Sequence, residues 1–383
     1  MISSTQKSWL GLAGAAAVTL GLALGAGRGD AGQASGYEVL APITHDNLTI
    51  FPVVARGAIR DTSKFITLDE GVRSGEVVVT EAGGTRGLAR RRPHVPWTER
   101  PIRPIPGGGA RVNQLVLINN SDRPLILLAG EIVTGGKQDR VVGKDRIVPP
   151  ESDPIALDVF CVEPGRWVEQ TAEFKSFHSQ MAQPSVRRRA MAEQNQQAVW
   201  NEVSRSKESI IAAMPPPSPA AGGPSAGARA LESTSSYARI MATPAVQAHV
   251  DAVAAPLERS YQNLIRELRS RNAVGVVVAV NDELVWADLF ANPSLLEKYW
   301  PKLIRSYAAE AMTARAENVK LSPPDSRSAR EFLERLQGRR ENIESEPGVY
   351  RNTEISGDGF TVFELTALLP STGFEIHLAK MAE

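Results

Sequence analysis

Charged and aromatic side chains that could do chemistry are concentrated between residues 125 and 167, a stretch that also holds the single cysteine. The planar fork of arginine suits a carboxylate or a phosphate, and a tryptophan beside it can stack on a base or a sugar. A glutamate in the same place could serve as a general base. The candidate ligand-binding residues are Glu131, Lys137, Gln138, Asp139, Arg140, Arg146, Glu163, Arg166 and Trp167.

The same residues also permit a purely structural interpretation. Many charged groups beside buried strands are costly unless they are paired with one another. The cluster could therefore be an internal lattice of ion pairs that holds neighbouring hairpins in register. At the level of the sequence, both the ligand site and the lattice stay open.

The first element that must position these residues is a hairpin. Gly135 and Gly136 separate two runs that favour strands, a pattern typical of a two-residue turn. A turn of that length places Glu131 directly opposite Arg140. Opposite charges across an antiparallel pair contribute about 0.2–1 kcal/mol, so this pairing would support the register.

The second element is a predicted strand over residues 155–163, which is mostly apolar on both faces and is expected to be buried. It carries Glu163 to its end, and a Pro-Gly turn then presents Arg166 and Trp167. Cys161 lies on the same strand. A nucleophilic cysteine needs a lowered pKa, whereas Glu163 would raise the pKa of this thiol. We therefore interpret Cys161 as a small buried residue.

Three motifs in this stretch carry a family resemblance. They are Gly130-Glu131, Gly136-Lys137-Gln138-Asp139-Arg140 and Cys161-Val162-Glu163-Pro164-Gly165-Arg166-Trp167. With them the chain resembles the ARG and Rhodanese-Phosphatase-superfamily-associated Protein domain, over roughly residues 40 to 380. The name of this family implies a gene association between its members and ADP-ribosylglycohydrolases and rhodanese-phosphatases. Such an association is not a mechanism.

Composition limits the partners. The chain has 383 residues, with 43 lysines and arginines against 43 aspartates and glutamates, so its formal net charge is zero. No global field therefore attracts nucleic acid or an acidic membrane surface. We interpret the arginine runs at 90–92 and 187–189 as solvated surface. A small-molecule ligand or another partner stays possible.

Residues 1–34 are expected to direct export. Lys7 precedes an uncharged, small-residue apolar run over residues 9–24, which is typical of a secretory signal peptide. The alternative is an uncleaved N-terminal membrane anchor, because the run is near the lower length limit for spanning. We therefore expect a periplasmic or extracellular protein that meets the membrane only through this segment. With one cysteine it has no internal disulfide.

The remaining chain is predicted to be α+β. Short strands with frequent turns indicate a β-rich, sandwich-like or barrel-like core over 37–175, in which 67–74 forms a helix ended by Gly75. A helical segment then covers 176–213 and a Pro/Ala/Gly/Ser-rich linker covers 214–236. Residues 237–383 are expected to form an α+β part, with helices and a second antiparallel sheet packed on the core. Its predicted elements are helices at 246–271, 295–311 and 328–339, a hairpin turning at 281–282, and strands at 349–355, 360–368 and 374–378.

No metal site is predicted, although a Ca²⁺ or Mg²⁺ site made of carboxylates alone stays possible, and the sequence leaves any cofactor unknown. The 5 histidines are isolated, without the spacing of paired ligands on a helix or strand. Neither a phosphate-binding loop nor a dinucleotide fingerprint occurs. The leading hypothesis is a domain that binds a small ligand or a partner through the charged cluster. The alternatives are an enzyme acting on phosphate-bearing or ADP-ribose-like substrates and a structural envelope protein.

Overall fold

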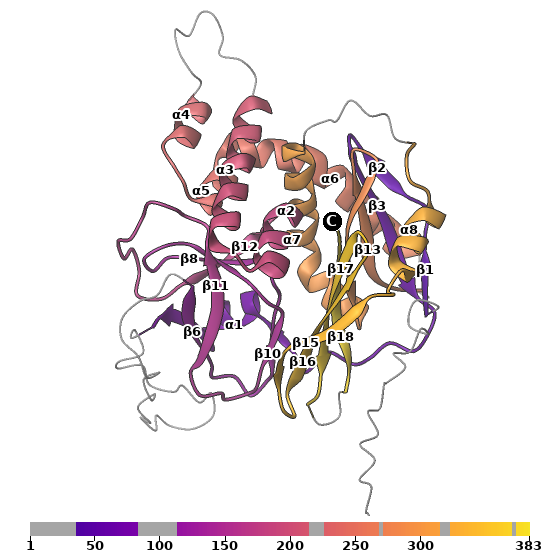
Figure 1. The fold of residues 1–383 in the computed structure, drawn as a ribbon, viewed down its shortest axis with the longest axis horizontal. Helices are drawn as coiled ribbons and strands as arrows, with labels where there is room; N and C mark the ends of the chain where they lie inside the picture. The colour runs from indigo at the N-terminus through magenta and orange to yellow at the C-terminus, as the bar shows by residue number, and fades with distance from the viewer. Residues whose placement is uncertain (1–35, 83–112, 214–225, 268–270, 315–321, 370–372) are drawn as a thin grey trace, which may run out of the picture.

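The computed structural model describes residues 36–82, 113–213, 226–267, 271–314, 322–369 and 373–383. The predicted export segment therefore lies outside the described residues, as does the arginine run at 90–92. Within these ranges the strands form three sheets, and a layer of helices lies between the N-terminal sheets and the large C-terminal sheet (Figure 1). The predicted α+β class is confirmed.

The N-terminal β unit consists of two sheets around one apolar core. A six-stranded sheet has the order β12-β8-β9-β11-β6-β5, and a three-stranded sheet has the order β10-β7-β4. Leu117, Leu127 and Val142 are among the fully buried residues that both sheets contribute to this core. The strands are Ile66–Thr67 (β4), Val77–Glu81 (β5), Gln114–Asn119 (β6), Leu125–Leu127 (β7), Glu131–Thr134 (β8), Arg140–Val142 (β9), Arg146–Val148 (β10), Ile155–Cys161 (β11) and Lys175–Met181 (β12).

The short helix α1, Leu68–Ser74, begins and ends as the sequence predicts. The Glu70 amide donates to the Thr67 hydroxyl (3.3 Å), and the Thr67 amide donates to the Glu70 carboxylate (2.8 Å). This reciprocal capping box satisfies amides that the first turn leaves open. Gly75 ends the helix in the left-handed region, with φ of 74°.

The helical layer is centred on α7, Pro293–Thr313. Its Tyr299 and Tyr307 are fully buried in a core that also contains residues of the β unit and of the large sheet. The Tyr299 hydroxyl donates to the carbonyl of Ile126 on β7 (3.2 Å). The other helices are Pro184–Arg188 (α2), the π-helix Arg189–Glu193 (η2), Gln196–Ala213 (α3), Ala226–Glu232 (α4), Tyr237–Ala242 (α5), Pro244–Glu267 (α6) and Ser326–Glu334 (α8).

Two predictions between residues 175 and 236 are wrong in part. The segment predicted as helical over 176–213 begins with strand β12, Lys175–Met181, which pairs with β8. Helix α4 lies inside residues 214–236, which the sequence indicates as a flexible linker or surface loop. The segment Ala226–Glu232 reads AGARALE, and alanine and leucine are strong helix formers. For the proline-rich residues 214–225, which lie outside the described residues, the linker stays a prediction.

The large antiparallel sheet has nine strands and combines both ends of the chain. Its order is β1-β3-β13-β14-β18-β17-β16-β15, with β2 paired to β3. Leu48 on β3 lies opposite Val280 on β13, so the first strands join the C-terminal sheet. The predicted division at residue 175 therefore does not separate the sheets. The strands are Tyr37–Val39 (β1), Ile43–His45 (β2), Leu48–Ala55 (β3), Asn272–Val280 (β13), Glu283–Phe290 (β14), Arg339–Glu346 (β15), Tyr350–Gly357 (β16), Phe360–Ala367 (β17) and Phe374–Ala382 (β18).

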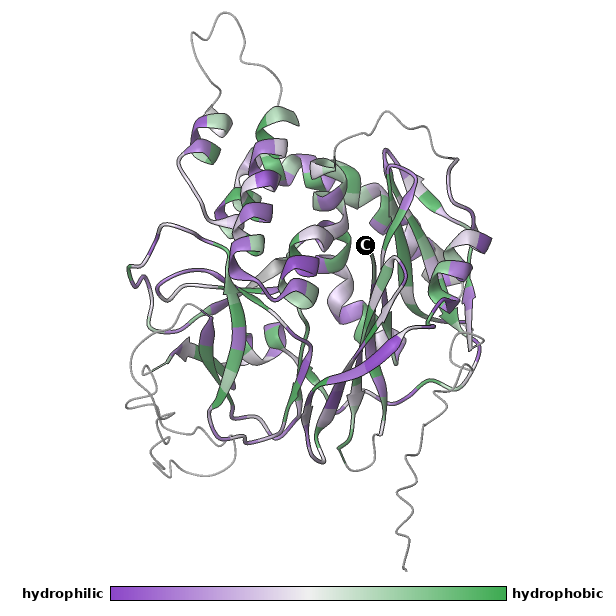
Figure 2. Cartoon of the chain, viewed as in Figure 1, coloured by the Kyte–Doolittle hydropathy of each residue, from purple (hydrophilic) through white to green (hydrophobic). Residues whose placement is uncertain are grey.

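Local sequence determines two features of this sheet, the turn between β13 and β14 and the charge of an edge strand. Asn281 and Asp282 both have positive φ, 50° and 66°, and make the predicted tight turn between β13 and β14. Strand β15, which the sequence did not indicate, is mostly charged and lies at the sheet edge (Figure 2). Charged residues on an edge strand disfavour pairing with another chain.

The large sheet is strongly curled. Tyr37 on β1 and Arg351 on β16 lie near opposite ends of the strand order, yet they line the same hollow. Inside the curl is a separate apolar core that includes Phe51, Leu289 and Val362. Among the described helices, none is long and apolar enough to cross a membrane.

Candidate functional site

The connection between β8 and β9 is longer than the predicted two-residue turn. Ile132 lies opposite Val141, and Val133 lies opposite Arg140. This register is two residues away from the predicted pairing, so Glu131 does not face Arg140. The prediction of an ion pair between them is wrong.

The longer loop is held by side chains that accept its amides. Gly135 donates to the Asp139 carboxylate (3.1 Å), and Lys137 donates to Glu81 on β5 (2.8 Å). Gly135 and Gly136 have φ of 123° and 47°, a region that glycine adopts without strain. A turn signal in the sequence does not reveal these long-range acceptors.

Glu131 forms a buried ion pair away from the other predicted residues. Its carboxylate accepts hydrogen bonds from the Leu128 amide (2.8 Å) and from Lys302 of α7. Lys302 also pairs with Asp69 of α1 (2.9 Å). Burial alone would lower the pKa of Lys302, but the two carboxylates raise it, so the ammonium stays charged.

Arg146 also lies apart from the cluster. Its guanidinium donates to the Tyr350 hydroxyl (2.8 Å) and to the Ala156 carbonyl (2.5 Å), and pairs with Glu344 (2.7 Å). Tyr350 and Glu344 belong to β16 and β15. Arg146 therefore connects the β unit to the large sheet, in agreement with the lattice interpretation for this residue.

The other predicted residues are brought together by the β8–β9 loop, the end of β11 and the turn that follows it. Glu81 of β5 and Ser236 before α5 join them, although neither is among the predicted site residues; Glu81 belongs only to the Val79-Thr80-Glu81 motif that also fits the family resemblance. We call this group the Trp167 cluster: Glu81, Lys137, Gln138, Asp139, Arg140, Glu163, Arg166, Trp167 and Ser236.

Arg166 is the centre of the cluster's hydrogen bonds. Its guanidinium pairs with Glu163 (2.5 Å) and more distantly with Asp139 (3.5 Å), and it donates to the Gly136 carbonyl (2.9 Å). Glu163 also accepts the Asp139 amide (3.1 Å). The two predicted motifs are therefore joined through Arg166.

Asp139 links the cluster to the helical layer. Its carboxylate accepts the Ser236 hydroxyl (2.7 Å), and the same hydroxyl accepts the Arg239 amide (3.1 Å) as the N-cap of α5. Burial raises the pKa of Asp139, and the charge of Glu163 adds to the rise against the hydrogen bond from Ser236.

The outer part of the cluster is accessible. The Trp167 side chain is 44% exposed, which is unusual for a large aromatic residue. The Lys137 ammonium lies 5.2 Å from the centre of its ring, and the Arg140 guanidinium lies 6.0 Å from it. An exposed aromatic face with cations beside it can bind a planar or anionic group.

Cys161 is buried, as the sequence suggests. Its main-chain amide and carbonyl are both bound by the Gln196 side chain of α3 (2.8 and 2.9 Å). Burial raises the pKa of the thiol. These features describe an inert packed residue and supply no activated nucleophile.

A second polar centre, which the predicted site residues do not include, lies around Asp288 of β14, in the Asp288-Leu289-Phe290 motif that also fits the family resemblance. Arg187 of α2 binds this carboxylate through two parallel hydrogen bonds (2.9 and 3.0 Å). The carboxylate also accepts the Trp286 indole N–H (2.9 Å) and the Tyr307 hydroxyl (2.5 Å). The Arg187 guanidinium holds the pKa of Asp288 far below its usual range, against the effect of burial.

His377 of β18 completes this centre. Its two ring nitrogens lie 2.5 Å from Asp145 and 3.2 Å from Asp288. Burial would lower the pKa of His377, but the two carboxylates raise it to about 9. The group is fully buried, and no set of three or more metal-ligating side chains is arranged for an ion in the described ranges.

Two sequence signals could have revealed this centre. Strand β14 is apolar after its first residue, Glu283, except for Asp288, and a buried acid in such a run requires a partner. Arg187, interpreted as solvated surface, is instead fully buried, so that interpretation is wrong. A Cβ on Gly130 would lie 2.6 Å from the Arg187 side chain, which explains why glycine precedes Glu131.

The fold and these two polar centres define an α+β protein in which charged residues join two β units through a helical layer. The chain belongs to the ARG and Rhodanese-Phosphatase-superfamily-associated Protein domain family, whose model matches residues 36–381. The resemblance seen in the motifs is thereby confirmed. No curated protein and no solved structure matches the chain.

The raised pKa of His377 predicts a pH dependence of folding. Because its pKa of about 9 exceeds the ordinary 6.5, the stabilisation by His377 is complete below pH 6.5 and is lost as pH rises through 9. The variant His377→Gln should lose roughly 3 kcal/mol at pH 6, since one pKa unit corresponds to about 1.4 kcal/mol. Denaturant unfolding from pH 6 to 10 measures the difference.

The quantity to compare at each pH is the free energy of unfolding of the unmodified protein minus that of His377→Gln, because each curve alone also contains the titration of other groups. Burial lowers the pKa of Lys380 to about 7, which gives an opposite slope in both proteins and cancels. A stability difference that stays constant from pH 6 to 10 would contradict the assignment.

The ion pair of Lys302 predicts a large loss of stability. Lys302→Met leaves two carboxylates without their ammonium and should cost about 3–5 kcal/mol. The control is Lys298→Met, one turn earlier, whose 31% exposed side chain pairs with Glu70 and should cost about 0–1 kcal/mol. Adding Glu131→Gln to Lys302→Met should recover part of the loss. Equal costs for the two lysines would refute this account.

Proposed function

We propose that the protein binds a small ligand at the Trp167 cluster, and that this ligand combines a planar or sugar ring with polar groups. One observation carries the proposal. Within the described residues, Glu81 Oε2, Gln138 Oε1 and Arg166 Nε are buried and make no hydrogen bond to another protein atom. All three atoms belong to the cluster that includes the exposed ring of Trp167.

Such atoms are costly in a finished fold. Leaving one buried polar atom without a partner costs about 1–3 kcal/mol, and native proteins keep few of them. Two acceptors and one donor in one cluster would be satisfied by hydroxyl or amide groups of a ligand or by water. Trp167 supplies a stacking surface, and Lys137 supplies a positive charge beside it.

The contacts favour binding over catalysis. Cys161 is buried with a raised pKa, and Glu163 is held by Arg166. Neither group is poised to attack a substrate or to take its proton. An ADP-ribose-like molecule nevertheless has the ring and the polar groups that the cluster would bind.

The test measures ligand binding by calorimetry. Adenosine monophosphate, ADP-ribose and ribose 5-phosphate are titrated into the full-length chain, and at least one should bind saturably. Trp167→Ala should weaken that binding roughly tenfold or more, because stacking on an aromatic side chain contributes about 1–3 kcal/mol per base. Val168→Ala, at the neighbouring 71% exposed position, is the matched control and should change nothing.

Two results would count against this function. One is the absence of saturable heat with all three compounds. The other is an equal affinity of the Trp167→Ala and Val168→Ala variants, which would leave the cluster as an internal lattice.

We also propose that the protein is exported. Support comes from Lys7 and the uncharged run over residues 9–24. A C-terminal fusion to alkaline phosphatase, which is active only outside the cytoplasm, should therefore be active. The same fusion without residues 1–34 serves as the control and should be inactive. Equal activity of the two fusions would refute export through this segment.

A further inference from the structure

The large sheet has a hollow of about 530 Å³ at one end of its curl. Strands from both ends of the sheet order line it, together with the segment that follows β3. Ligand sites are commonly found in the mouths of curled or closed sheets, and this volume is in the range of such sites. It is separate from the Trp167 cluster, none of whose residues line it.

Side chains of the curl's interior face give this hollow its chemistry. On β17, Val362 belongs to the apolar core inside the curl, and Glu364 and Thr366 follow at the same face by strand alternation. On β16, Ile355 belongs to that core, and Arg351 shares its face. The interior therefore changes from apolar to polar towards the mouth.

The polar side chains of the mouth are only partly paired. Arg340 binds Glu364 through two hydrogen bonds (2.5 and 3.2 Å), which neutralises that carboxylate. Arg60 and Arg351 are exposed, and neither has an acidic partner within ion-pair distance among the described residues. Three arginines against two glutamates leave one net positive charge in the lining.

Aromatic residues form the walls. The Arg60 guanidinium lies 6.0 Å from the centre of the Phe374 ring, so one cation is held beside an apolar surface. Tyr37 is half-buried in the same lining. Burial raises the pKa of the Tyr37 hydroxyl, and the charges of Glu375 and Glu364 raise it further, so it stays a hydrogen-bond donor.

We propose that this mouth binds a small organic anion, with Arg351 and Arg60 contacting a carboxylate or phosphate group and Tyr37 and Phe374 contacting its apolar part. The guanidinium fork matches both kinds of acid group. The aromatic walls select an anion with an apolar or aromatic body over an inorganic ion. The positive charge would also make binding weaken as salt concentration rises.

The test uses phenyl phosphate, benzoate and inorganic phosphate as probes of the full-length chain, measured by calorimetry at low and high salt. At least one of the first two should bind saturably, more tightly than inorganic phosphate and more weakly in high salt. The tighter of the two identifies the acid group. Inorganic phosphate binding as tightly as phenyl phosphate would overturn the assignment to an organic anion.

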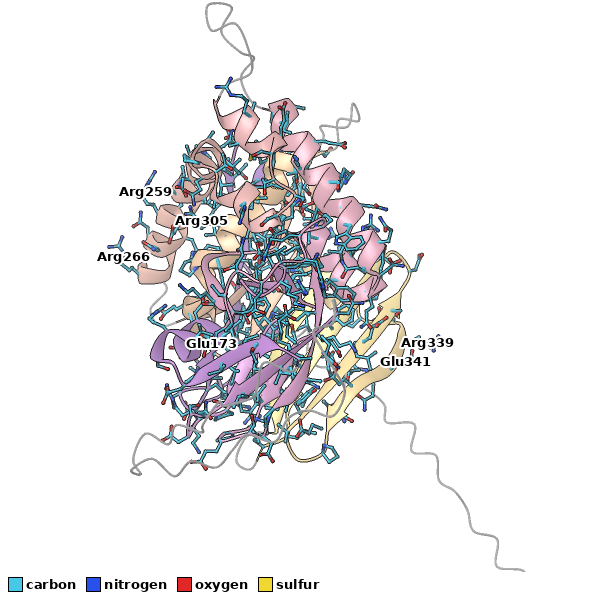
Figure 3. The ribbon with its side chains drawn as sticks, turned by 90° about the vertical axis from the view of Figure 1, so that its left-hand side faces the viewer. Glu173, Arg259, Arg266, Arg305, Arg339 and Glu341 are labelled. Atoms are coloured by element: carbon cyan, nitrogen blue, oxygen red, sulfur yellow. The ribbon has the colours of Figure 1, made fainter. Side chains whose placement is uncertain are left out.

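The decisive variants are Arg351→Gln and its matched control Arg339→Gln. Arg339 is the neighbour of Arg340 on β15, pairs with Glu341 and projects away from the body of the protein (Figure 3). Arg351→Gln should weaken binding at least tenfold, whereas Arg339→Gln should leave it unchanged. Equal affinity of these two variants, or no saturable binding by the unmodified chain, would overturn the proposal.

Two further variants keep the result interpretable. Arg60→Gln, in the segment after β3, should also weaken binding and replaces Arg351→Gln if that variant does not fold. Trp167→Ala should leave benzoate and phenyl phosphate binding unchanged. An effect of Trp167→Ala equal to that of Arg351→Gln would show that the probes bind at the other site and would overturn the proposal.

Discussion

The buried pair of Arg187 and Asp288 is the interaction on which the arrangement of the layers depends. Removing two charges from water costs several kcal/mol per ion, and only nearly ideal geometry offsets that cost. Here the carboxylate accepts five hydrogen bonds: two from N–H groups of the single Arg187 guanidinium, and one each from Trp286, Tyr307 and His377. The partners come from α2, β14, α7 and β18, so the bonds form only when the layers are correctly docked.

Other charged residues also connect the layers. Lys302 connects α7 to α1 and the β unit, and Arg146 connects the β unit to the large sheet. Both are interior pairs that specify how apolar surfaces meet. The Trp167 cluster differs, because part of it is exposed and because Glu81, Gln138 and Arg166 each have a buried polar atom with no hydrogen-bond partner among the described protein residues. A candidate site is therefore distinguished from an internal ion-pair lattice by its exposure to solvent and by buried polar atoms without hydrogen-bond partners, more than by its charge.

Local features of the sequence predicted local structure well. The capping residues of α1 and the Asn281-Asp282 turn are specified by neighbouring residues, and both form as expected. The β8–β9 turn was mispredicted because Glu81, distant in sequence, holds the loop open. Arg187 was mispredicted because a run of arginines usually faces solvent, and only its partner Asp288 identifies the exception. The class of fold was readable from the sequence, but partners across elements were not.

The pairing of β3 with β13 has a consequence for how the chain is made. Strand β3 has no neighbour on the β13 side until Val280, about 230 residues after Leu48, has been synthesised. Synthesis at roughly 5–20 residues per second separates the two by tens of seconds. Residues Leu48–Val54 of β3 are all buried in the folded protein. During that interval they are not covered by β13. The apolar strand β3 is then accessible to chaperones and to other nascent chains. The order of synthesis itself therefore creates a risk of incorrect association.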